Sequence, residues 1–310
     1  MVVGRLSKVV APGFKAVAVA LLLEYSIICA LMSFCAGSAT LVCCLLLLLG
    51  LMLVGEETLD PVSPNKPWIR ALCMISALAA LVIGGRNYHA TFAPYLVASQ
   101  GRSYKDVSAT ATASDHADAG TILFKNGTVL DESKAIGLRL YGHTYCVAPI
   151  SMRQAAATQP EAGAPGPTVQ FWAVGLDCCK QRSSFDCDDA GNADAKGGVA
   201  LYTPDDGEEA LMRQIFAPRV FRAGYFRAIE GATALYGLQS ASLPVLVRWT
   251  KEPDSMMQGW LVASILVWLV STLQYSGVLA LIWYATNYKS RRARYGRENS
   301  GLSSQGLPPF

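Results

Sequence analysis

Charged residues are scarce in this chain. Only 16% of its 310 residues are Asp, Glu, Lys or Arg, whereas 52% are hydrophobic. Soluble proteins of this size carry about 25% charged residues. The composition therefore argues against an ordinary soluble protein and indicates a membrane protein.

Motifs that identify enzymes are also missing. The sequence has no G-x-S-x-G nucleophile turn, no glycine pattern that cradles phosphate, and no C-x-x-C spacing of a zinc site. The segment SDHADAG, 114–120, places His116 between Asp115 and Asp118, which acid–base catalysis can use but a polar loop produces equally well. We expect no catalysis and no cofactor, with His116 as the residue to test if an enzyme is suspected.

Long apolar runs are what the sequence has instead. The first run, 14–54, is interrupted by one acid, Glu24. A helix needs about 20 apolar residues to cross the hydrocarbon layer, so this run is too long for one straight crossing. The small residues CAGSAT, 35–40, predict a hairpin of two helices, 14–35 and 38–54. The alternatives are one helix over 25–54 after an interfacial segment, or a signal sequence with a small-residue site near Ala36.

Basic residues near the two chain ends predict the orientation. The tail NYKSRRARYGRE, 287–298, holds five Lys or Arg and one Glu, and such a flank is retained in the cytoplasm. Arg5, Lys8 and Lys15 precede the first acid, so we expect the N-terminus to be cytoplasmic too. Both ends inside require an even number of crossings, which favours four.

The predicted fold class is four transmembrane helices plus a lumenal or extracellular α+β domain with an antiparallel sheet and disulfides. The membrane is the plasma membrane or an endomembrane. The predicted order is a cytoplasmic N-terminus over 1–13, a hairpin over 14–54, a cytoplasmic loop over 55–67, a third helix over 68–85, the outer domain over 86–257, a fourth helix over 258–284 and a basic cytoplasmic tail over 285–310.

The outer region reads as a mixture of strands and one helical stretch. Short segments rich in Val, Tyr, Phe and Trp, bounded by Gly, Asp or Pro, are typical of strands: 107–112, 121–125, 136–141, 144–150, 169–175, 198–202 and 244–250. Residues 205–238 read as helical, and Pro218 should divide them. On the second piece Phe221, Tyr225, Ile229 and Ala232 form one apolar stripe. Acidic and basic residues nearly balance, which gives no electrostatic case for nucleic acid.

Four of the nine cysteines lie in the outer region, an even number suited to disulfides in an oxidising compartment. They are Cys146, Cys178, Cys179 and Cys187. A bridge between the adjacent pair is uncommon, which leaves two pairings: Cys146 with Cys178 and Cys179 with Cys187, or Cys146 with Cys179 and Cys178 with Cys187. If the preceding strand continues through the pair, the two side chains point to opposite faces. Asn126, in the pattern NGT, is an N-glycosylation acceptor on the same side of the membrane.

Calcium is the metal that the acidic segment after the adjacent cysteines could bind. Its candidate oxygen ligands are Asp186, Asp188, Asp189, Asn192 and Asp194. The EF-hand order fails, because Ala190 takes a ligand position and Gly197 replaces the closing Glu. Fastening of the fold by the cysteines is the preferred interpretation of this cluster.

Two polar residues within the apolar helices, Glu24 and Gln274, are candidates for a transport role. An acid inside a bilayer is costly and usually has a task or a partner. The alternative is a helix boundary that leaves Glu24 among the headgroups.

The layout resembles that of tetraspanins: three crossings, a large outer region with the adjacent pair Cys178–Cys179, a last crossing and a short tail. In that family the pair precedes glycine and makes disulfides, whereas Lys180 follows it here. The segments YCVAPI and FWAVGLDCC are also similar to multi-pass membrane proteins of unicellular algae, which implies no activity. We expect a non-enzymatic protein in contact with membrane lipid, whose outer domain binds or organises a protein partner. The alternatives are a transport or channel subunit using Glu24, and a ligand sensor.

Overall fold

The computed structural model describes residues 14–35, 67–140, 142–153, 168–180, 182, 184–201 and 222–302. The chain divides into two compact units. We call Met1–Gly85 with Ile265–Phe310 the helical unit, and Arg86–Ser264 the sheet domain. The predicted helix 38–54, most of the loop 55–67 and the division at Pro218 lie outside the described residues.

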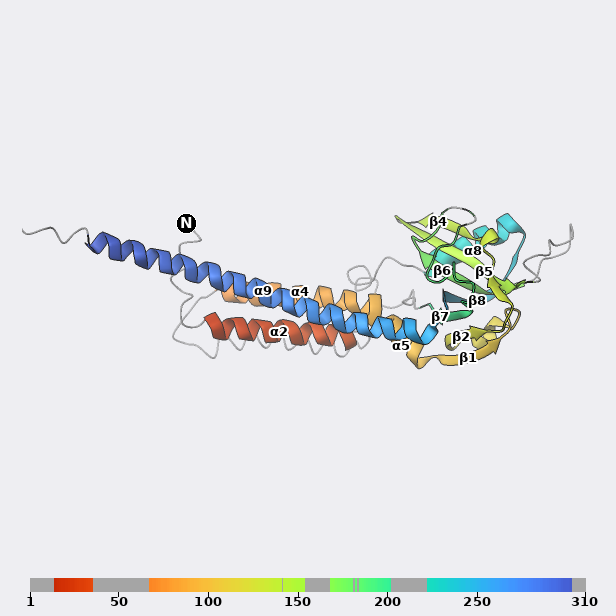
Figure 1. The fold of residues 1–310 in the computed structure, drawn as a ribbon, viewed down its shortest axis with the longest axis horizontal. Helices are drawn as coiled ribbons and strands as arrows, with labels where there is room; N and C mark the ends of the chain where they lie inside the picture. The colour runs from red at the N-terminus through yellow and green to blue at the C-terminus, as the bar shows by residue number, and fades with distance from the viewer. Residues whose placement is uncertain are drawn as a thin grey trace, which may run out of the picture. The chain divides into compact units, whose positions relative to one another are not determined.

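Three helices in the described residues are long and apolar enough to cross a membrane, over Ala18–Cys35, Ala71–Gln100 and Pro253–Ala285. They belong to α2 (Phe14–Cys35), to α4 (Pro67–Asn87) with its continuation, and to α9 (Pro253–Leu302) (Figure 1). The predicted first, third and fourth helices are thus confirmed as helices. Four crossings were expected and three candidates are found here. Because α2 runs through Glu24 without a break, a helix that starts at Tyr25 is ruled out.

The third candidate span is longer than expected. After α4 the helix continues through a π-helical turn, η1 (Tyr88–Phe92), into α5 (Ala93–Gln100). Gly101 then leaves the helix with extended backbone, and the first strand of the sheet follows it. The sequence interpretation stopped this helix at 85, because the apolar run ends before Arg86.

Small and aromatic residues hold the helical unit together. A Cβ at Gly84 on α4 would lie 2.6 Å from the Cβ of Met32 and 2.7 Å from the carbonyl oxygen of Cys29, both on α2. Between α2 and α9, Tyr25 stacks on Tyr275 with ring centroids 4.3 Å apart. Such close backbone approach at small residues is how helices associate in lipid, where no hydrophobic force drives them together.

The outer surface of these helices is apolar. Large hydrophobic side chains that are more than half exposed include Val19, Leu23 and Ile27 on α2, Met74, Ile75 and Leu78 on α4, and Leu266, Leu273, Val278 and Leu281 on α9. Soluble proteins rarely expose continuous apolar surface of this extent. The helical unit is therefore suited to contact with lipid.

The sheet domain is built on one eight-stranded sheet in the order β1-β2-β7-β8-β6-β5-β3, with β4 also paired to β5. Its strands are β1 (Arg102–Val107), β2 (Ala119–Phe124), β3 (Thr128–Leu130), β4 (Ile136–Leu140), β5 (His143–Met152), β6 (Thr168–Leu176), β7 (Gly197–Ala200) and β8 (Gln239–Thr250). Short 3-10 turns, η2 (Ala113–His116) and η3 (Glu132–Lys134), lie between strands.

The sheet is mixed, so the prediction of an antiparallel sheet is wrong. β1 pairs with β2 in parallel, and β6 pairs with β8 in parallel, while the other pairs are antiparallel. Parallel neighbours need a long connection that returns the chain to the same end of the sheet. The chain between β6 and β8 provides one, because it contains α8 (Arg222–Tyr236).

The predicted strand 107–112 is also wrong, because the strand β1 ends at Val107 and turns follow. Asp106, with a φ of 57°, lies where the β1–β2 pairing shifts register. β1 was not predicted from the sequence, because its residues, RSYKDV, are charged and mostly exposed, which is typical of an edge strand.

Alternation along the central strands gives each face of the sheet its own core. Tyr145, Trp172 and Leu246 pack on Tyr225, Ile229 and Ala232 of α8. This confirms the apolar stripe for these three helix residues, while Phe221 lies outside the described residues. The opposite face carries Cys146, Phe171 and Trp249, and the loop after β6 packs on it through Phe185, Cys187 and Ala195.

Candidate functional site

Two glycines flank a cysteine on β5. Cys146 on β5 is directly paired with Gly137 on β4 and with Gly175 on β6. A Cβ at Gly175 would overlap the sulfur atoms of Cys178 and Cys187, and one at Gly137 would lie 2.8 Å from the sulfur of Cys179. The missing side chains therefore leave the space that the disulfide sulfurs occupy.

The four outer cysteines form two disulfides over this row. Cys146 is bonded to Cys179 with their Cα atoms 5.8 Å apart, and Cys178 is bonded to Cys187 with their Cα atoms 5.1 Å apart. The structure thus selects the second of the two pairings that the sequence left open. Cys146 and Cys187 are buried and the adjacent pair is partly buried. The Cys146–Cys179 bond fastens the loop after β6 to β5, and the Cys178–Cys187 bond closes a turn within that loop.

The adjacent cysteines do not point to opposite faces of a strand. β6 ends at Leu176, and Asp177 takes a left-handed conformation with a φ of 58°. Its carboxylate accepts hydrogen bonds of 2.7 Å from the amide of Thr144 and from Nδ1 of His143. Both bonds stabilise the charged form and hold the pKa of Asp177 below its usual value, with the His143 bond the larger cause. The turn at Asp177 then brings both cysteines over the same face.

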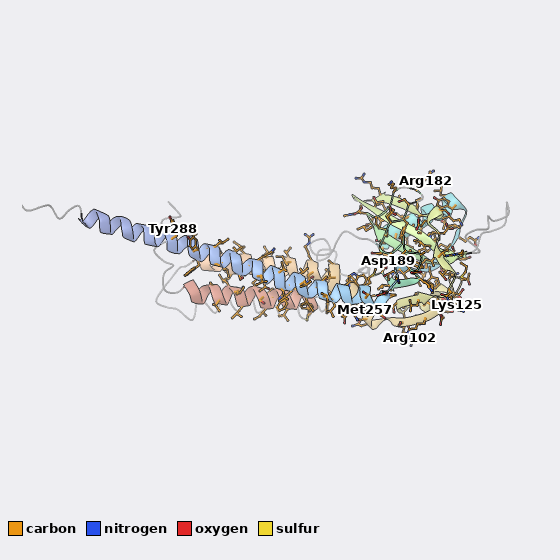
Figure 2. The ribbon with its side chains drawn as sticks, in the orientation of Figure 1. Arg102, Lys125, Arg182, Asp189, Met257 and Tyr288 are labelled. Atoms are coloured by element: carbon orange, nitrogen blue, oxygen red, sulfur yellow. A yellow bond between two sulfur atoms is a disulfide. The ribbon has the colours of Figure 1, made fainter. Side chains whose placement is uncertain are left out.

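The acidic segment is tied to the end of β8. The carboxylate of Asp188 forms an ion pair with Arg248, whose Nε lies 3.0 Å from Oδ2. Asp189, labelled in Figure 2, accepts bonds of 2.8 Å from the amide of Lys251 and the hydroxyl of Thr250. These two bonds, in that order of importance, lower the pKa of Asp189. Arg248 also lies 5.4 Å from the ring centroid of Trp260.

The other calcium candidates have separate partners. Asp186 accepts a bond of 3.3 Å from Ser184, Asn192 accepts one of 3.0 Å from the amide of Asp194, and Asp194 lies 3.8 Å from Nζ of Lys251. Among the described residues, the metal-ligand atoms of His, Cys, Asp and Glu that come within 4.8 Å of one another in a group of three belong to Cys146, Cys178 and Cys187. Those sulfurs are bonded in disulfides. A calcium ion would have to replace the contacts of Asp188 and Asp189 with β8.

His116 is held by aromatic rings rather than by the neighbouring acids. Its ring lies 4.8 Å from that of Tyr104 and 5.7 Å from that of Phe171, and its Nδ1 contacts the carbonyl of Thr112 at 3.0 Å. Asp118 instead accepts a 2.7 Å bond from the hydroxyl of Tyr104, which raises the pKa of that phenol. Arg102 lies 3.2 Å from the same carboxylate.

The histidine that contacts a carboxylate is His143, which the sequence interpretation did not single out. Asp177 lies 34 positions away along the chain and comes into reach because β5 and β6 pair with Tyr145 opposite Leu176. Only knowledge of that register could have revealed the pair. Since Asp177 also accepts the amide of Thr144, the pair closes the end of the β5–β6 ladder.

Asn126 lies in the exposed turn between β2 and β3, where Gly127 has a φ of 88°. Its Oδ1 accepts a 2.6 Å bond from Nζ of Lys196. The position is open enough for a sugar, and the glycosylation itself remains a prediction.

The polar groups of the helices occupy different environments. Glu24 is half-buried on α2, whereas Gln274 is exposed on α9. Sequence reasoning missed Asn87, a buried residue whose side-chain amide donates 2.9 Å and 3.3 Å bonds to the carbonyl and hydroxyl of Ser264. The hydroxyl of Thr91 donates a 2.9 Å hydrogen bond to the side-chain oxygen of Asn87. This network joins the first residues of the sheet domain to α9.

Comparison of the chain with protein-family models, with curated proteins and with solved structures finds no match. None of these comparisons supports the likeness to tetraspanins, and the sheet domain is built on an eight-stranded mixed sheet.

Proposed function

We propose that this chain is a multi-pass membrane protein whose sheet domain binds a protein partner and performs no catalysis. The proposal rests on one observation: the side chains that could react or bind a metal are engaged with other residues of the same domain. The four cysteines are bonded in pairs, and Asp177, Asp188 and Asp189 are engaged with neighbouring strands. Such a domain is a firmly held scaffold, and a rigid scaffold binds with little ordering cost.

The surface that we assign to the partner is the group Arg102, Tyr104, His116 and Asp118 at the edge of the sheet, called the Tyr104 patch. Tyr and Arg are the side chains most enriched at the centres of protein interfaces. Tyr104 is half-buried against His116 and held by Asp118, so its ring is already ordered before binding. Among the described strands, β1 pairs with β2 alone, so the patch borders an edge open to a partner.

The test is proximity labelling in intact cells with the full chain. Tyr104→Ala with Arg102→Ala should remove the main labelled protein, because these side chains supply the contact area and the charge. Lys105→Ala is the matched control, since Lys105 is exposed on the same strand. Equal labelling of all three chains, or robust turnover of a small substrate that requires His116, would overturn the proposal.

The proposal places the sheet domain outside the cytosol and both chain ends inside. Asn126→Gln should abolish a glycosidase-sensitive shift in mobility if the domain is outside. Protease treatment of sealed vesicles should cleave the C-terminal tail and spare the sheet domain. Cleavage of the sheet domain from the cytosolic side would refute this orientation.

A further inference from the structure

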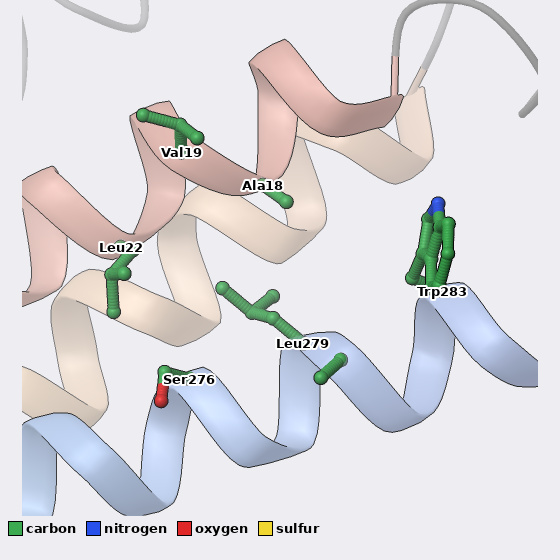
Figure 3. A pocket seen from close by; sticks show the side chains of 7 residues that line it. Ala18, Val19, Leu22, Ser276, Leu279 and Trp283 are labelled. Atoms are coloured by element: carbon green, nitrogen blue, oxygen red, sulfur yellow. The ribbon is translucent and has the colours of Figure 1, made fainter.

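An apolar groove of about 400 Å³ lies between α2 and α9 within the helical unit (Figure 3). It is lined by Ala18, Val19, Leu22, Ser276, Leu279, Ala280 and Trp283. The hydroxyl of Ser276 donates a 2.8 Å bond to the carbonyl of Leu273, so it is already used within α9. The groove therefore offers hydrocarbon surface and fits an apolar chain.

Small side chains on both helices create the groove. Figure 3 shows Ala18, Val19 and Leu22 on α2 facing Ser276, Leu279 and Trp283 on α9. Val19 is 57% exposed and Trp283 is 41% exposed, so the groove opens on the outer surface of the unit. An occupant can enter it sideways from surrounding lipid.

One end of the groove carries aromatic residues. Trp283, Tyr284 and Tyr288 follow one another along α9, and the two tyrosines are 63% and 54% exposed. Trp and Tyr gather at headgroup depth in membrane proteins. If the helical unit lies in a membrane, the groove end near Trp283 is the end expected to point towards the phosphates of one leaflet.

Both helices carry basic residues just beyond that end. The antiparallel contacts Tyr25–Tyr275 and Cys29–Ser271 place the start of α2 beside the later part of α9. Lys289 comes six residues after Trp283, about 9 Å along the helix axis. Arg291 and Arg292 follow, and Lys15 lies three residues before Ala18 in the first turn of α2.

We propose that this groove binds an acyl chain of an anionic phospholipid, with the phosphate at the level of Lys15 and Lys289. The groove supplies the apolar contacts, and the basic residues supply an attraction that a zwitterionic lipid lacks. This inference rests on the helical unit lying in a membrane and is independent of the partner of the sheet domain.

The test uses the full chain in lipid nanodiscs and the fluorescence of Trp283. Brominated acyl chains quench a tryptophan that they touch, and the difference between the wild type and Trp283→Phe isolates the signal of Trp283. We expect half-maximal quenching at about ten-fold less brominated phosphatidylglycerol than brominated phosphatidylcholine, because several basic residues contribute. Replacing Lys289, Arg291 and Arg292 with Gln should bring the two lipids close together.

Two further variants test the groove itself. Ala280→Phe should fill it and remove the preference for the anionic lipid, whereas Leu281→Phe should keep it, because Leu281 is 70% exposed and does not line the groove. Ala18→Leu serves if Ala280→Phe does not fold. Equal quenching of wild-type Trp283 by both lipids would mean ordinary surrounding lipid and would overturn the proposal. A disulfide between Val19→Cys and Cys43 or Cys44, or between two copies of Val19→Cys, would also overturn it, because a protein segment would then fill the groove.

Discussion

Glycine allows close packing in both units, and in the sheet domain two of the glycines lie against disulfide sulfurs. In the helical unit Gly84 lets α4 approach the backbone of α2. In the sheet domain Gly137 and Gly175 make room for sulfur atoms. The difference between the two units lies in the disulfides beside Gly137 and Gly175. Lipid gives helices no hydrophobic reason to associate, so close backbone contact must hold them. The loop after β6 is polar, and cross-links hold it where apolar contact is insufficient.

The largest expected effect is the loss of the Cys146–Cys179 bond. Cys146→Ala with Cys179→Ala should lower the free energy of unfolding of the sheet domain by about 2–4 kcal/mol, because the unfolded loop gains freedom. Urea unfolding of the full chain in detergent, followed by near-UV circular dichroism, measures it. Cys35→Ser is the control, since Cys35 is a free cysteine on α2. An equal loss in both chains would contradict the role of the bond.

Gly84→Ala should disturb the close packing of α4 on α2 in the helical unit. The new Cβ would meet Met32 and the Cys29 carbonyl within 3 Å, and overpacking of this kind costs about 1–3 kcal/mol. Thermal loss of helical circular dichroism in detergent reports it. Gly277→Ala is the matched control on α9, because nothing lies within 4 Å of its added Cβ. There alanine should slightly raise the melting temperature. A lowered melting temperature for both variants would count against close α2–α4 packing.

Asp189→Asn probes the contact of the acidic segment with β8. Asn can keep one acceptor but loses the charge, so the bonds from Thr250 and Lys251 weaken by about 1 kcal/mol together. The urea midpoint of the sheet domain should fall accordingly, while Asp186→Asn, at an exposed site, should leave it unchanged. If calcium shifts the midpoint of the wild type but not of Asp189→Asn, the segment binds the metal after all.

The smallest expected effect is the pH dependence from Asp177. Its folded pKa lies below the ordinary value of 3.8, so its contribution is present above about pH 4 and is lost as the pH falls through the folded value. The group is exposed, so the contribution is below about 1 kcal/mol. Urea midpoints between about pH 2 and pH 6 should fall less in Asp177→Asn than in the wild type. Identical pH profiles for the wild type and Asp177→Asn would show that the His143–Asp177 pair does not contribute to stability.

The helices were the part of the fold that the sequence could predict. The long apolar run that begins at Phe14 is a local signal, and α2 has the predicted bounds, Phe14–Cys35. β5 and β6 were found for the same reason, since their buried runs end in Gly, Asp or charged residues. β1 was not, because an exposed edge strand has no apolar pattern to read.

The site depended on contacts between residues distant in sequence. Pairing of Cys146 with Cys179 follows from the turn at Asp177 and from the register that sets Gly137 and Gly175 beside Cys146. Neither the register nor the parallel β6–β8 pair has a local signature. For the same reason the sequence drew attention to His116, whose flanking acids are neighbours in the chain only, and passed over His143.

Gly137, Cys146 and Gly175 lie side by side on three neighbouring strands, so the residue that each position tolerates depends on the other two. If Cys146 and Cys179 were both lost, the space above Gly137 would become a void that a larger side chain could fill. If the cysteines stay, neither glycine can change without displacing a sulfur atom. In proteins that descend from this chain, the two glycines and the cysteines should therefore change together. Such covariation would reveal common ancestry even where most of the remaining sequence has diverged.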